Sequence, residues 1–422
     1  MKHRLRKTKE AFLNTARKLD CFVFDRIGPI KALFLVHDLR GFQQMQPLIA
    51  ALLARGVAVR ISLIDTATIE SYHLNQIDHQ LTKLFIPVRL GRLKKWHYIF
   101  QSEVTFFYPA RFATRVQLSH GSGWGNLTTY PCNTLKTIQR QSSISISVLY
   151  SNAHLEYFKQ HDEQLTKKQD FLCVIGGSPK LDALKPLSRT AIASLRSSLG
   201  MQDIITVAVT SHWRPKSILP RFGENLIDAI TTEFSQPVQI VILGHEKLWE
   251  ENEEQIQAQK QSSLAERIAG KVALTANTFF IRDPKQQRDY LRASDIVVHD
   301  NSSVLIECLC LEKSTVFLRT PETMPIEPTI ADVYIRAGQC FSSLSDLPNA
   351  ISRALINPSE RRSIQRDMLA LMVSRRGNSA DFLADLVVKI GRVSGPKSHG
   401  WAKARKLIAF ANAELDHQNA QA

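Results

Sequence analysis

One turn in the second half of the chain combines residue types that could bind a phosphate. It lies between the apolar run "IVV" and the run "VLIECLC", and it consists of Asp300, Asn301, Ser302 and Ser303. When a buried strand ends in serines before a helix, hydroxyl groups and free backbone N–H groups gather at the helix amino terminus, where an anion is stabilised. We therefore predict a phosphate-binding turn here, the simpler alternative being a serine-capped helix that binds nothing.

A histidine in a glycine-rich loop could move a proton. In "LSHGSGWGN", His120 leaves an apolar, strand-like run, and Gly121, Ser122 and Gly123 follow it directly. Glycine lets a backbone approach a ligand closely, and an imidazole with a pKa of about 6.5 can take or give a proton near neutral pH. We predict that His120 acts as a general base, the alternative being a histidine with a purely structural role.

Polar residues also end other apolar runs of the second half. Arg214 closes "VTSHWR", and His245 follows "VILG". Because the carboxyl ends of parallel strands meet at one edge of a sheet, we expect these side chains to share a ligand with the turn at 300–303. His299, next to Asp300, competes with His245 for the role of the functional histidine in this half.

The elements that must position these residues follow a regular alternation. "KALFLV" is typical of a buried strand, an amphipathic helix follows it, and Gly56 ends that helix before the strand "VAVRISL". The second half repeats this alternation, so the sequence predicts an α/β fold with two Rossmann-like domains and mostly parallel sheets facing across a cleft. The turn "VIGGSPKLDAL", with Gly176 and Ser178, indicates a hinge between them.

The same pattern suggests the limits of four segments. Residues 1–26 form a basic amphipathic amino-terminal segment, 27–190 the first domain, 191–394 the second domain, and 395–422 a final helix that is expected to pass back to the first domain. Residues 1–19 carry seven Lys or Arg and one Glu. Such a segment either lies on an anionic membrane surface or remains a solvated basic tail, and the sequence leaves both interpretations open.

Composition narrows the choice of partners. The chain has 422 residues, 44% of them hydrophobic, a formal net charge of +15 and a pI near 9.6. This balance predicts an anionic partner: a phosphorylated substrate, an anionic membrane face or nucleic acid. The sequence contains neither a basic motif interleaved with aromatic residues nor a zinc-ligand spacing, so nucleic acid is not an expected partner.

Cysteine usage and hydropathy predict a cytoplasmic location. The six cysteines are scattered and lack the C-x-x-C spacing, which is typical of reduced core residues. No apolar run approaches the length of a membrane span, and the amino terminus lacks the apolar centre of a secretion signal. We expect a cytoplasmic protein that is peripheral on the inner face of the cytoplasmic membrane if its basic amino-terminal segment binds lipid.

Five ordered motifs between about residues 116 and 385 resemble those of the CDP-glycerol glycerophosphotransferase family, the teichoic acid and capsule polymer transferases of the GT-B superfamily. They are "VQLSHGSG", "VIGGSPKLDAL", "VTSHWR", "LRASDIVVHDNSSVLIECLCLEKSTVFL" and "RRGNSADFLADLV". The resemblance implies the GT-B fold, with an acceptor domain followed by a nucleotide-donor domain. It also implies transfer of a glycerophosphate-like group from a CDP-activated donor to a cell-envelope polymer or lipid-linked acceptor.

The resemblance also implies roles for individual residues. His120 would be the base on the acceptor hydroxyl, within an acceptor loop that includes Gly121, Ser122 and Gly123, and His245 would meet the donor diphosphate. The donor diphosphate and nucleotide would be bound by Arg214, Asp300, Ser302, Ser303, Glu307, Gly176 and Ser178. The displacement at phosphorus would use Arg214 and the helix terminus in place of a metal, and no cofactor is implied.

Other functions remain open. The family usually has a tyrosine where Asn301 stands and a tryptophan where Ser119 stands, so a related nucleotide-activated donor is also consistent with the motifs. A GT-B glycosyltransferase that uses a nucleotide sugar, or an enzyme similar to UDP-sugar 2-epimerases, would place a serine pair and a glutamate at a similar helix. A non-catalytic binding module of an envelope-assembly complex is a further alternative.

Overall fold

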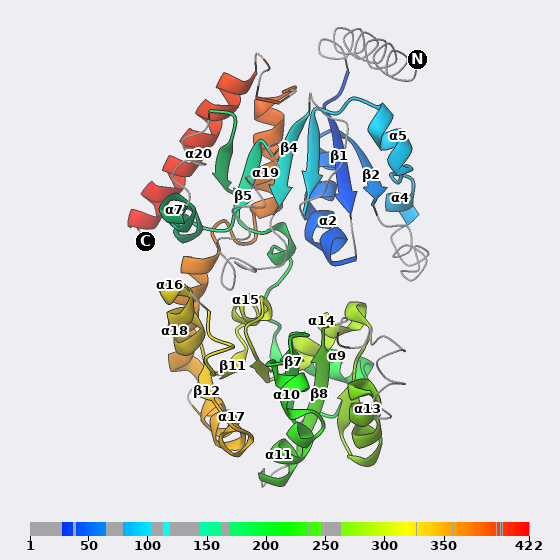
Figure 1. Ribbon diagram of the computed structural model, residues 1–422, viewed down its shortest axis with the longest axis vertical. Coiled ribbons are helices and arrows are strands. Elements are labelled where there is room, and N and C mark those ends of the chain that lie inside the picture. The colour runs from blue at the N-terminus through cyan, green and yellow to red at the C-terminus, as the bar shows by residue number, and fades with distance from the viewer. Residues whose placement is uncertain are drawn as a thin grey trace, which may run out of the picture. The chain divides into compact units, whose positions relative to one another are not determined.

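The chain folds into two compact units (Figure 1). In the part of the chain that the structure describes, the first unit comprises residues 28–183 together with residues from Val373 onward, and the second is Leu184–Met372. The computed structural model describes residues 28–36, 39–64, 79–102, 113–118, 144–161, 169–233, 237–245, 248, 263–325, 327–356, 358–393, 395–396, 398 and 400–421.

A six-stranded parallel sheet forms the centre of the first unit. Its strands are β1 (Lys31–Val36), β2 (Ala58–Leu63), β3 (Tyr98–Gln101), β4 (Thr114–Leu118), β5 (Ile146–Leu149) and β6 (Leu172–Ile175). They lie in the order β2-β1-β3-β4-β5-β6, and every pairing is parallel. Strands β3, β4 and β5 are buried throughout, as expected for a parallel sheet whose two faces are covered.

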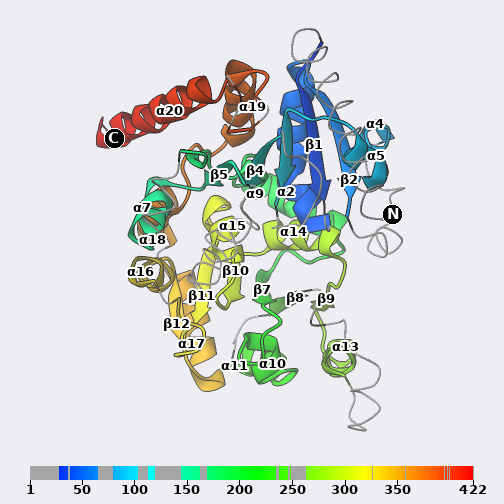
Figure 2. The same cartoon turned by 45° about the horizontal axis from the view of Figure 1, so that its top comes forward.

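Helices from both ends of the chain cover this sheet. They are α2 (Leu39–Ala54), α4 (His79–Thr82), α5 (Val88–Leu93), α7 (Asn152–His161), the 3-10 turn η3 (Pro179–Leu181), α19 (Ser379–Ile390) and α20 (Trp401–Gln421). Helices α4 and α5 lie beside β2, and α20 packs against β6 (Figures 1 and 2). Arg55, which follows α2, binds α19 through Asp385 at 2.7 Å and Asp381 at 3.0 Å.

The structure differs from the sequence-based domain limits in the position of α19. We expected the second domain to run from 191 to 394, whereas the units divide at Ala183 and Leu184 and the chain rejoins the first unit at Val373. The reason is the apolar face of α19, on which Leu383 and Val387 belong to the same buried core as the strand residue Phe34. Helix α20 also belongs to the first unit.

The second unit contains another six-stranded parallel sheet. Its strands are β7 (Ile205–Ser211), β8 (Val238–Gly244), β9 (Thr278–Phe280), β10 (Ile296–His299), β11 (Ser314–Leu318) and β12 (Gln339–Phe341). Their order is β12-β11-β10-β7-β8-β9, again with every pairing parallel. The α/β fold class and the two Rossmann-like domains are therefore confirmed.

Helices precede, connect and follow these strands. They are α9 (Arg189–Ser198), α10 (Ile218–Phe222), α11 (Asn225–Glu233), α13 (Leu264–Leu274), α14 (Pro284–Ala293), α15 (Val304–Cys310), α16 (Pro328–Arg336), the 3-10 turn η5 (Leu344–Asp346), α17 (Leu347–Leu355) and α18 (Pro358–Met372). The sheet and helices α10, α11, α13 and α17 contribute to one apolar core, which includes Val209, Ile242 and Val298.

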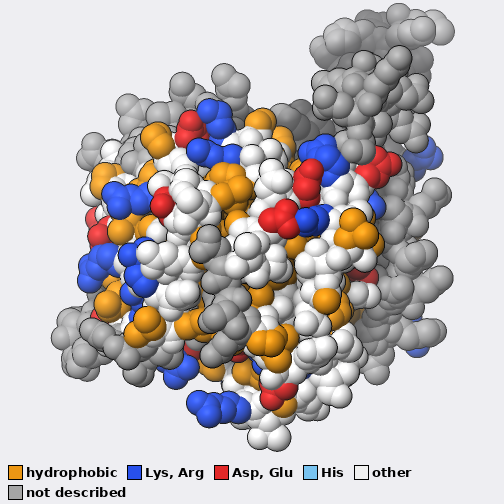
Figure 3. All heavy atoms as spheres, turned by 90° about the horizontal axis from the view of Figure 1, so that it is seen from below, with side chains coloured by type: hydrophobic (Ala, Val, Ile, Leu, Met, Phe, Trp, Pro, Cys, Tyr) orange, Lys and Arg blue, Asp and Glu red, His pale blue; other side chains and the backbone are white. Residues whose placement is uncertain are grey.

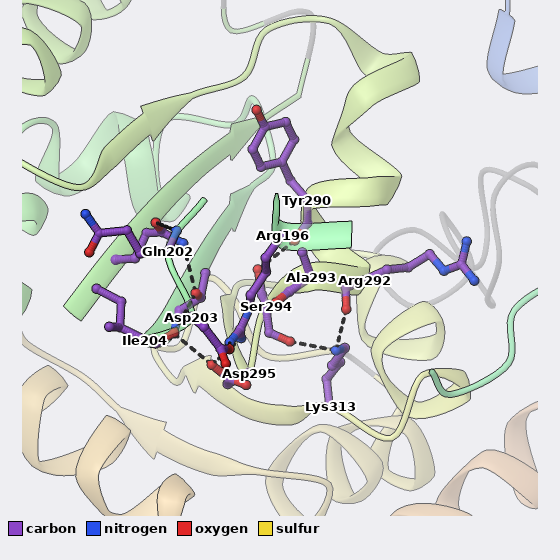
Figure 4. A network of polar contacts seen from close by, with 12 residues as sticks. Arg196, Gln202, Asp203, Ile204, Tyr290, Arg292, Ala293, Ser294, Asp295 and Lys313 are labelled. Carbon is purple, nitrogen blue, oxygen red and sulfur yellow. Dashed lines mark hydrogen bonds and ion pairs between the residues drawn. The ribbon is translucent and has the colours of Figure 1, made fainter. Parts of the chain in front are cut away.

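An ion-pair network around the buried Arg196 joins the residues that precede β7 and β10 (Figure 4). Arg196, whose side chain is 7% exposed, binds Asp203 at 2.9 Å and Asp295 at 2.7 Å. Asp295 Oδ2 also accepts the backbone N–H of Thr206 at 2.8 Å. A pocket of about 610 Å³ borders these residues, but it lies at the strand amino ends, opposite the edge where parallel sheets bind ligands.

Lys313, just before β11, is buried beside the same network (Figure 4). Its Nζ donates hydrogen bonds to the carbonyl oxygens of Arg292 at 2.7 Å and Ser294 at 2.6 Å. Burial lowers the pKa of Lys313 to about 8, because the charged form loses its hydration.

The surface view in Figure 3 shows Lys and Arg, Asp and Glu, and apolar side chains interspersed on one face of the protein. Among the helices of the described residues, none is both long enough and apolar enough to cross a lipid bilayer.

Candidate active site

The strand order of the second unit marks one position for ligand binding. From β7 the chain passes to β8 on one side, and it later returns to β10 on the other side of β7. In open parallel sheets, ligands bind outside the strand carboxyl ends at this reversal. Ser211 is the last residue of β7, and His299 is the last residue of β10.

Asp300 joins these two strand ends. Its carboxylate accepts the backbone N–H of His212 at 3.0 and 3.2 Å, the hydroxyl of Ser211 at 3.2 Å and the backbone N–H of Ile218 at 3.2 Å. The side chain of Ser217 is a further hydrogen-bond partner. Asp300 thus holds both ends of the loop 212–217, which carries Arg214, at the end of β10.

Burial and hydrogen bonding act in opposite directions on the pKa of Asp300. The residue is 1% exposed, and burial raises the pKa of its carboxyl above the ordinary value. The hydrogen bonds from Ile218, His212, Ser211 and Ser217 lower this pKa and offset part of the effect. The buried side chain of Asp300 therefore acts as a hydrogen-bond acceptor for the backbone of the loop.

Two histidine rings lie together at the ends of β7 and β8. The ring centroids of His212 and His245 are 5.5 Å apart, and the backbone N–H of His245 donates to the carbonyl oxygen of Ser211 at 3.1 Å. Nδ1 of His212 accepts the backbone N–H of Arg214 at 3.3 Å. Trp213 stacks on His212 with centroids 5.4 Å apart and is 44% exposed.

The serine turn lies at the start of α15, as the sequence predicted. The backbone N–H of Ser302 donates to the carbonyl oxygen of Asp300 at 2.7 Å, and the Ser302 hydroxyl accepts the N–H of Val304 at 3.3 Å. Ser303 occupies the N-cap position without a capping hydrogen bond from its side chain. Tyr334 holds the turn from α16, because its hydroxyl donates to the carbonyl oxygen of Ser302 at 2.8 Å.

His299 is buried beneath this turn. It is 0% exposed, and its ring lies 5.5 Å from that of Phe317 and 6.0 Å from that of Tyr334. Its Nδ1–H donates to the carbonyl oxygen of Asp300 at 3.0 Å, and burial lowers its pKa to about 4. The ring is therefore neutral at pH 7, and of the two histidines considered from the sequence, His245 is the partly exposed one.

Glu307 lies within α15, where it is 8% exposed. The structure thus brings Asp300, Ser302, Ser303 and Glu307 to one turn and its helix, and Asp300 connects this turn to the loop of Arg214. His120, Gly121, Ser122 and Gly123 lie outside the described residues.

Gly176 and Ser178 lie in the first unit, whereas the other predicted donor residues lie in the second. Gly176 is in close packing, since a Cβ there would come within 2.7 Å of side-chain atoms of both Leu383 and Val148. Ser178 is 1% exposed, and its hydroxyl accepts a hydrogen bond from the side chain of Gln44 at 3.2 Å.

The segment that follows these residues anchors α19. Asp182 accepts the backbone N–H of Ser379 at 3.1 Å and that of Ala380 at 2.7 Å, so it caps the amino terminus of this helix. The "GGSPKLD" segment therefore has an evident packing role in the first unit, and its assignment to donor binding stays a prediction.

Two residues at the second-unit site were not among the sequence-based candidates, namely His212 and Tyr334. His212 carried a signal, because it directly follows a strand and precedes Arg214. Tyr334 carried none, because its contact with the Ser302 turn joins residues 32 positions apart.

Comparisons with known proteins give a structural result only. No family model matches the chain, and no curated protein matches it in sequence. A structure of the wall teichoic acid polymerase TagF superposes with a TM-score of 0.59 at 12% identity, covering 92% of this chain and 98% of that one.

Epimerases of nucleotide sugars are also similar in structure. A putative UDP-N-acetylglucosamine 2-epimerase from Listeria monocytogenes has a TM-score of 0.56 at 14% identity, covering 86% of this chain and 96% of that one. UDP-GlcNAc 2-epimerase from Neisseria meningitidis, bound to UDP-GlcNAc, has a TM-score of 0.53 at 13% identity, covering 84% of this chain and 99% of that one. These likenesses establish the fold, two Rossmann-like domains of the GT-B class.

Proposed function

We propose that the protein is a transferase that moves a glycerophosphate-like group from a CDP-activated donor to a hydroxyl of a cell-envelope polymer or its lipid-linked precursor. The observation that carries this proposal is the connection of Asp300 to both the serine turn and the Arg214 loop at the strand-order reversal. The likeness in fold to a wall teichoic acid polymerase supports it. In this proposal the enzyme works in the cytoplasm, peripheral on the inner membrane face.

The chemistry of the turn suits a diphosphate. The Ser302 hydroxyl uses a lone pair to accept the Val304 N–H and can still donate its hydrogen to a phosphate oxygen. The Arg214 guanidinium supplies a permanent positive charge with several N–H donors. Preorganised donors of this kind stabilise the charge that develops in phosphoryl transfer. Gly176 and Ser178 remain proposed contributors from the first unit.

The proposed reaction is an in-line displacement at the phosphorus that carries glycerol. A bond forms between the acceptor oxygen and this phosphorus, and the bond from phosphorus to the bridging oxygen breaks. CMP leaves with that electron pair. His120, within the loop of Gly121, Ser122 and Gly123, takes the proton of the acceptor hydroxyl. His245 contacts the donor diphosphate.

A nucleotide-sugar enzyme is the second candidate. It is favoured by the epimerase structure that holds UDP-GlcNAc and by a UDP co-structure of MnaA from S. aureus. The paired rings of His212 and His245 could equally face a sugar diphosphate. The nucleotide released during turnover separates the candidates, since a CDP-glycerol transferase yields CMP and a glycosyltransferase that uses a UDP-sugar yields UDP.

The first test is direct binding. Isothermal titration with CDP, CMP, UDP and GDP should show selective binding of a cytidine nucleotide, and the double variant Ser302→Ala/Ser303→Ala should weaken it at least about tenfold. The variant Ser197→Ala/Ser198→Ala removes two exposed hydroxyls from α9 and is the matched control. Selective binding of UDP would favour the second candidate, and failure to bind any of the four would contradict both.

The second test is turnover. With CDP-glycerol and a lipid-linked acceptor, the wild-type chain should release CMP, and His245→Ala should lower kcat by about 100-fold or more if it acts on the diphosphate. A non-catalytic module would release no nucleotide in any form of the protein.

A further inference from the structure

Helix α5 presents an apolar face that points away from the core. Leu90 is 44% exposed and Leu93 is 68% exposed, both on a helix of one and a half turns beside the edge strand β2 (Figure 2). Leucines at positions i and i+3 lie on the same side of a helix. They therefore form one small apolar ridge.

Exposed cations flank this ridge along the chain. Arg89, Arg92 and Lys94 are exposed on or directly after α5, and Lys83 is exposed just before it. From His79 to Ser102 the sequence contains five Lys or Arg and neither Asp nor Glu. We call Lys83, Arg89, Leu90, Leu93 and Lys94 the α5 patch.

The fold holds the α5 patch outward. On the inner side of the helix, Gly91 is buried and its carbonyl oxygen accepts a hydrogen bond from Nε1 of Trp96 at 2.8 Å. Val88 packs on the buried cluster that includes Trp96 and Leu33. Because the inner face is occupied in this way, the two leucines cannot turn into the core without breaking these contacts.

We propose that the α5 patch binds the surface of an anionic lipid bilayer. Exposed leucines flanked by cations are the composition of interfacial segments that insert apolar side chains between lipid headgroups while Lys and Arg contact the phosphates. A soluble polyanion would engage the cations but would leave Leu90 and Leu93 in water. This inference adds a specific surface to the proposed peripheral location, and it needs none of the proposed donor chemistry.

Vesicle co-sedimentation of the full chain tests this inference without any nucleotide. Wild type should bind vesicles that contain phosphatidylglycerol, bind phosphatidylcholine vesicles far less, and dissociate as salt is raised. Leu90→Gln/Leu93→Gln and Arg89→Gln/Lys94→Gln should each lower the partition coefficient roughly tenfold. Circular dichroism and thermal unfolding should show both variants folded as in wild type.

Matched controls come from the second unit. Leu274→Gln/Ile356→Gln removes two exposed apolar residues, and Arg353→Gln/Arg366→Gln removes two exposed cations. Both should partition as wild type does. Loss of binding in these controls equal to the loss in the α5 variants would overturn the proposal, as would unchanged binding of the α5 variants.

Inorganic polyphosphate tests whether the α5 patch binds a soluble polyanion and not lipid. If it competes with vesicles and binds in a way that depends on Arg89 and Lys94, while Leu90→Gln/Leu93→Gln binds vesicles as wild type does, the patch recognises a polyanion and the lipid inference is wrong. Loss of nucleotide binding with retained lipid binding would instead contradict only the proposed reaction.

Discussion

The carboxylate of Asp300 accepts the backbone N–H of His212 at 3.0 and 3.2 Å, across 88 positions of sequence. This contact fixes the end of β10 to the loop after β7. The serine turn and the Arg214 loop therefore share one buried support, the carboxylate of Asp300.

Replacement of Asp300 by Asn should separate the two segments. The oxygen of the new amide side chain can accept some of the N–H groups, but its NH₂ group would face the remaining donors. We therefore expect the free energy of unfolding to fall by about 1–3 kcal/mol. Nucleotide affinity should fall at least about tenfold because Arg214 is no longer held. Urea unfolding and calorimetric titration measure the two effects. Asp332→Asn, on a half-exposed ion pair, should change neither.

The buried imidazole of His299 should destabilise the fold in acid. Its pKa is about 4 in the folded protein and about 6.5 when unfolded, so the unfolded chain binds the extra proton as pH falls from 6.5 to 4. Wild type should therefore lose up to roughly 3 kcal/mol of stability relative to His299→Phe across this window. Chemical unfolding of both proteins from pH 7.5 to 4 measures the difference. A constant difference would contradict a buried neutral imidazole.

The buried amine of Lys313 should affect stability in the alkaline range and, as for His299, stability should rise with pH. The folded pKa is about 8 against 10.5 for the free side chain, so between these values the unfolded chain binds more protons and stability rises with pH. Relative to Lys313→Met, wild type should gain up to roughly 3 kcal/mol between pH 8 and 10.5. Parallel denaturation curves across this range provide the measurement, and equal slopes for the two proteins would count against the depressed pKa.

Gly177 and Gly200 form a matched pair of glycines. Both have positive φ, +73° and +68°, but a Cβ on Gly177 would collide with the carbonyl oxygen of Ser374, whereas one on Gly200 meets nothing within 4 Å. Gly200→Ala should cost about 1–2 kcal/mol from backbone strain alone. Gly177→Ala should cost at least about 1 kcal/mol more. Thermal unfolding compares them, and equal costs would show that the turn after β6 can relax.

Much of the architecture was predictable from local patterns. Runs such as "IVV" and "KALFLV" became buried parallel strands, and Ser302 and Ser303 lie at the start of α15 as predicted. These features depend on hydrophobic periodicity and capping chemistry, which a few neighbouring residues determine.

The remaining features depend on contacts between distant segments. An amphipathic pattern predicts the helix α19 but does not say which apolar core it joins, so the expected limit at 394 was displaced to Val373. The burial of His299 depends on Phe317 and Tyr334, which come from the next strand and a later helix. Its place at a strand end resembled that of His245, and only the packing distinguishes them.

The division of the chain into two units also determines the order in which their cores can form during synthesis. Within the described residues the second unit is the single segment Leu184–Met372, whose core can form as soon as that segment has left the ribosome. The first unit must wait, because α19 and α20 fill its core and are made last. A nascent chain stalled before Val373 therefore carries a second unit with a complete core, while the core of the first unit still lacks the apolar residues of α19 and α20, a state to which chaperones would be expected to bind.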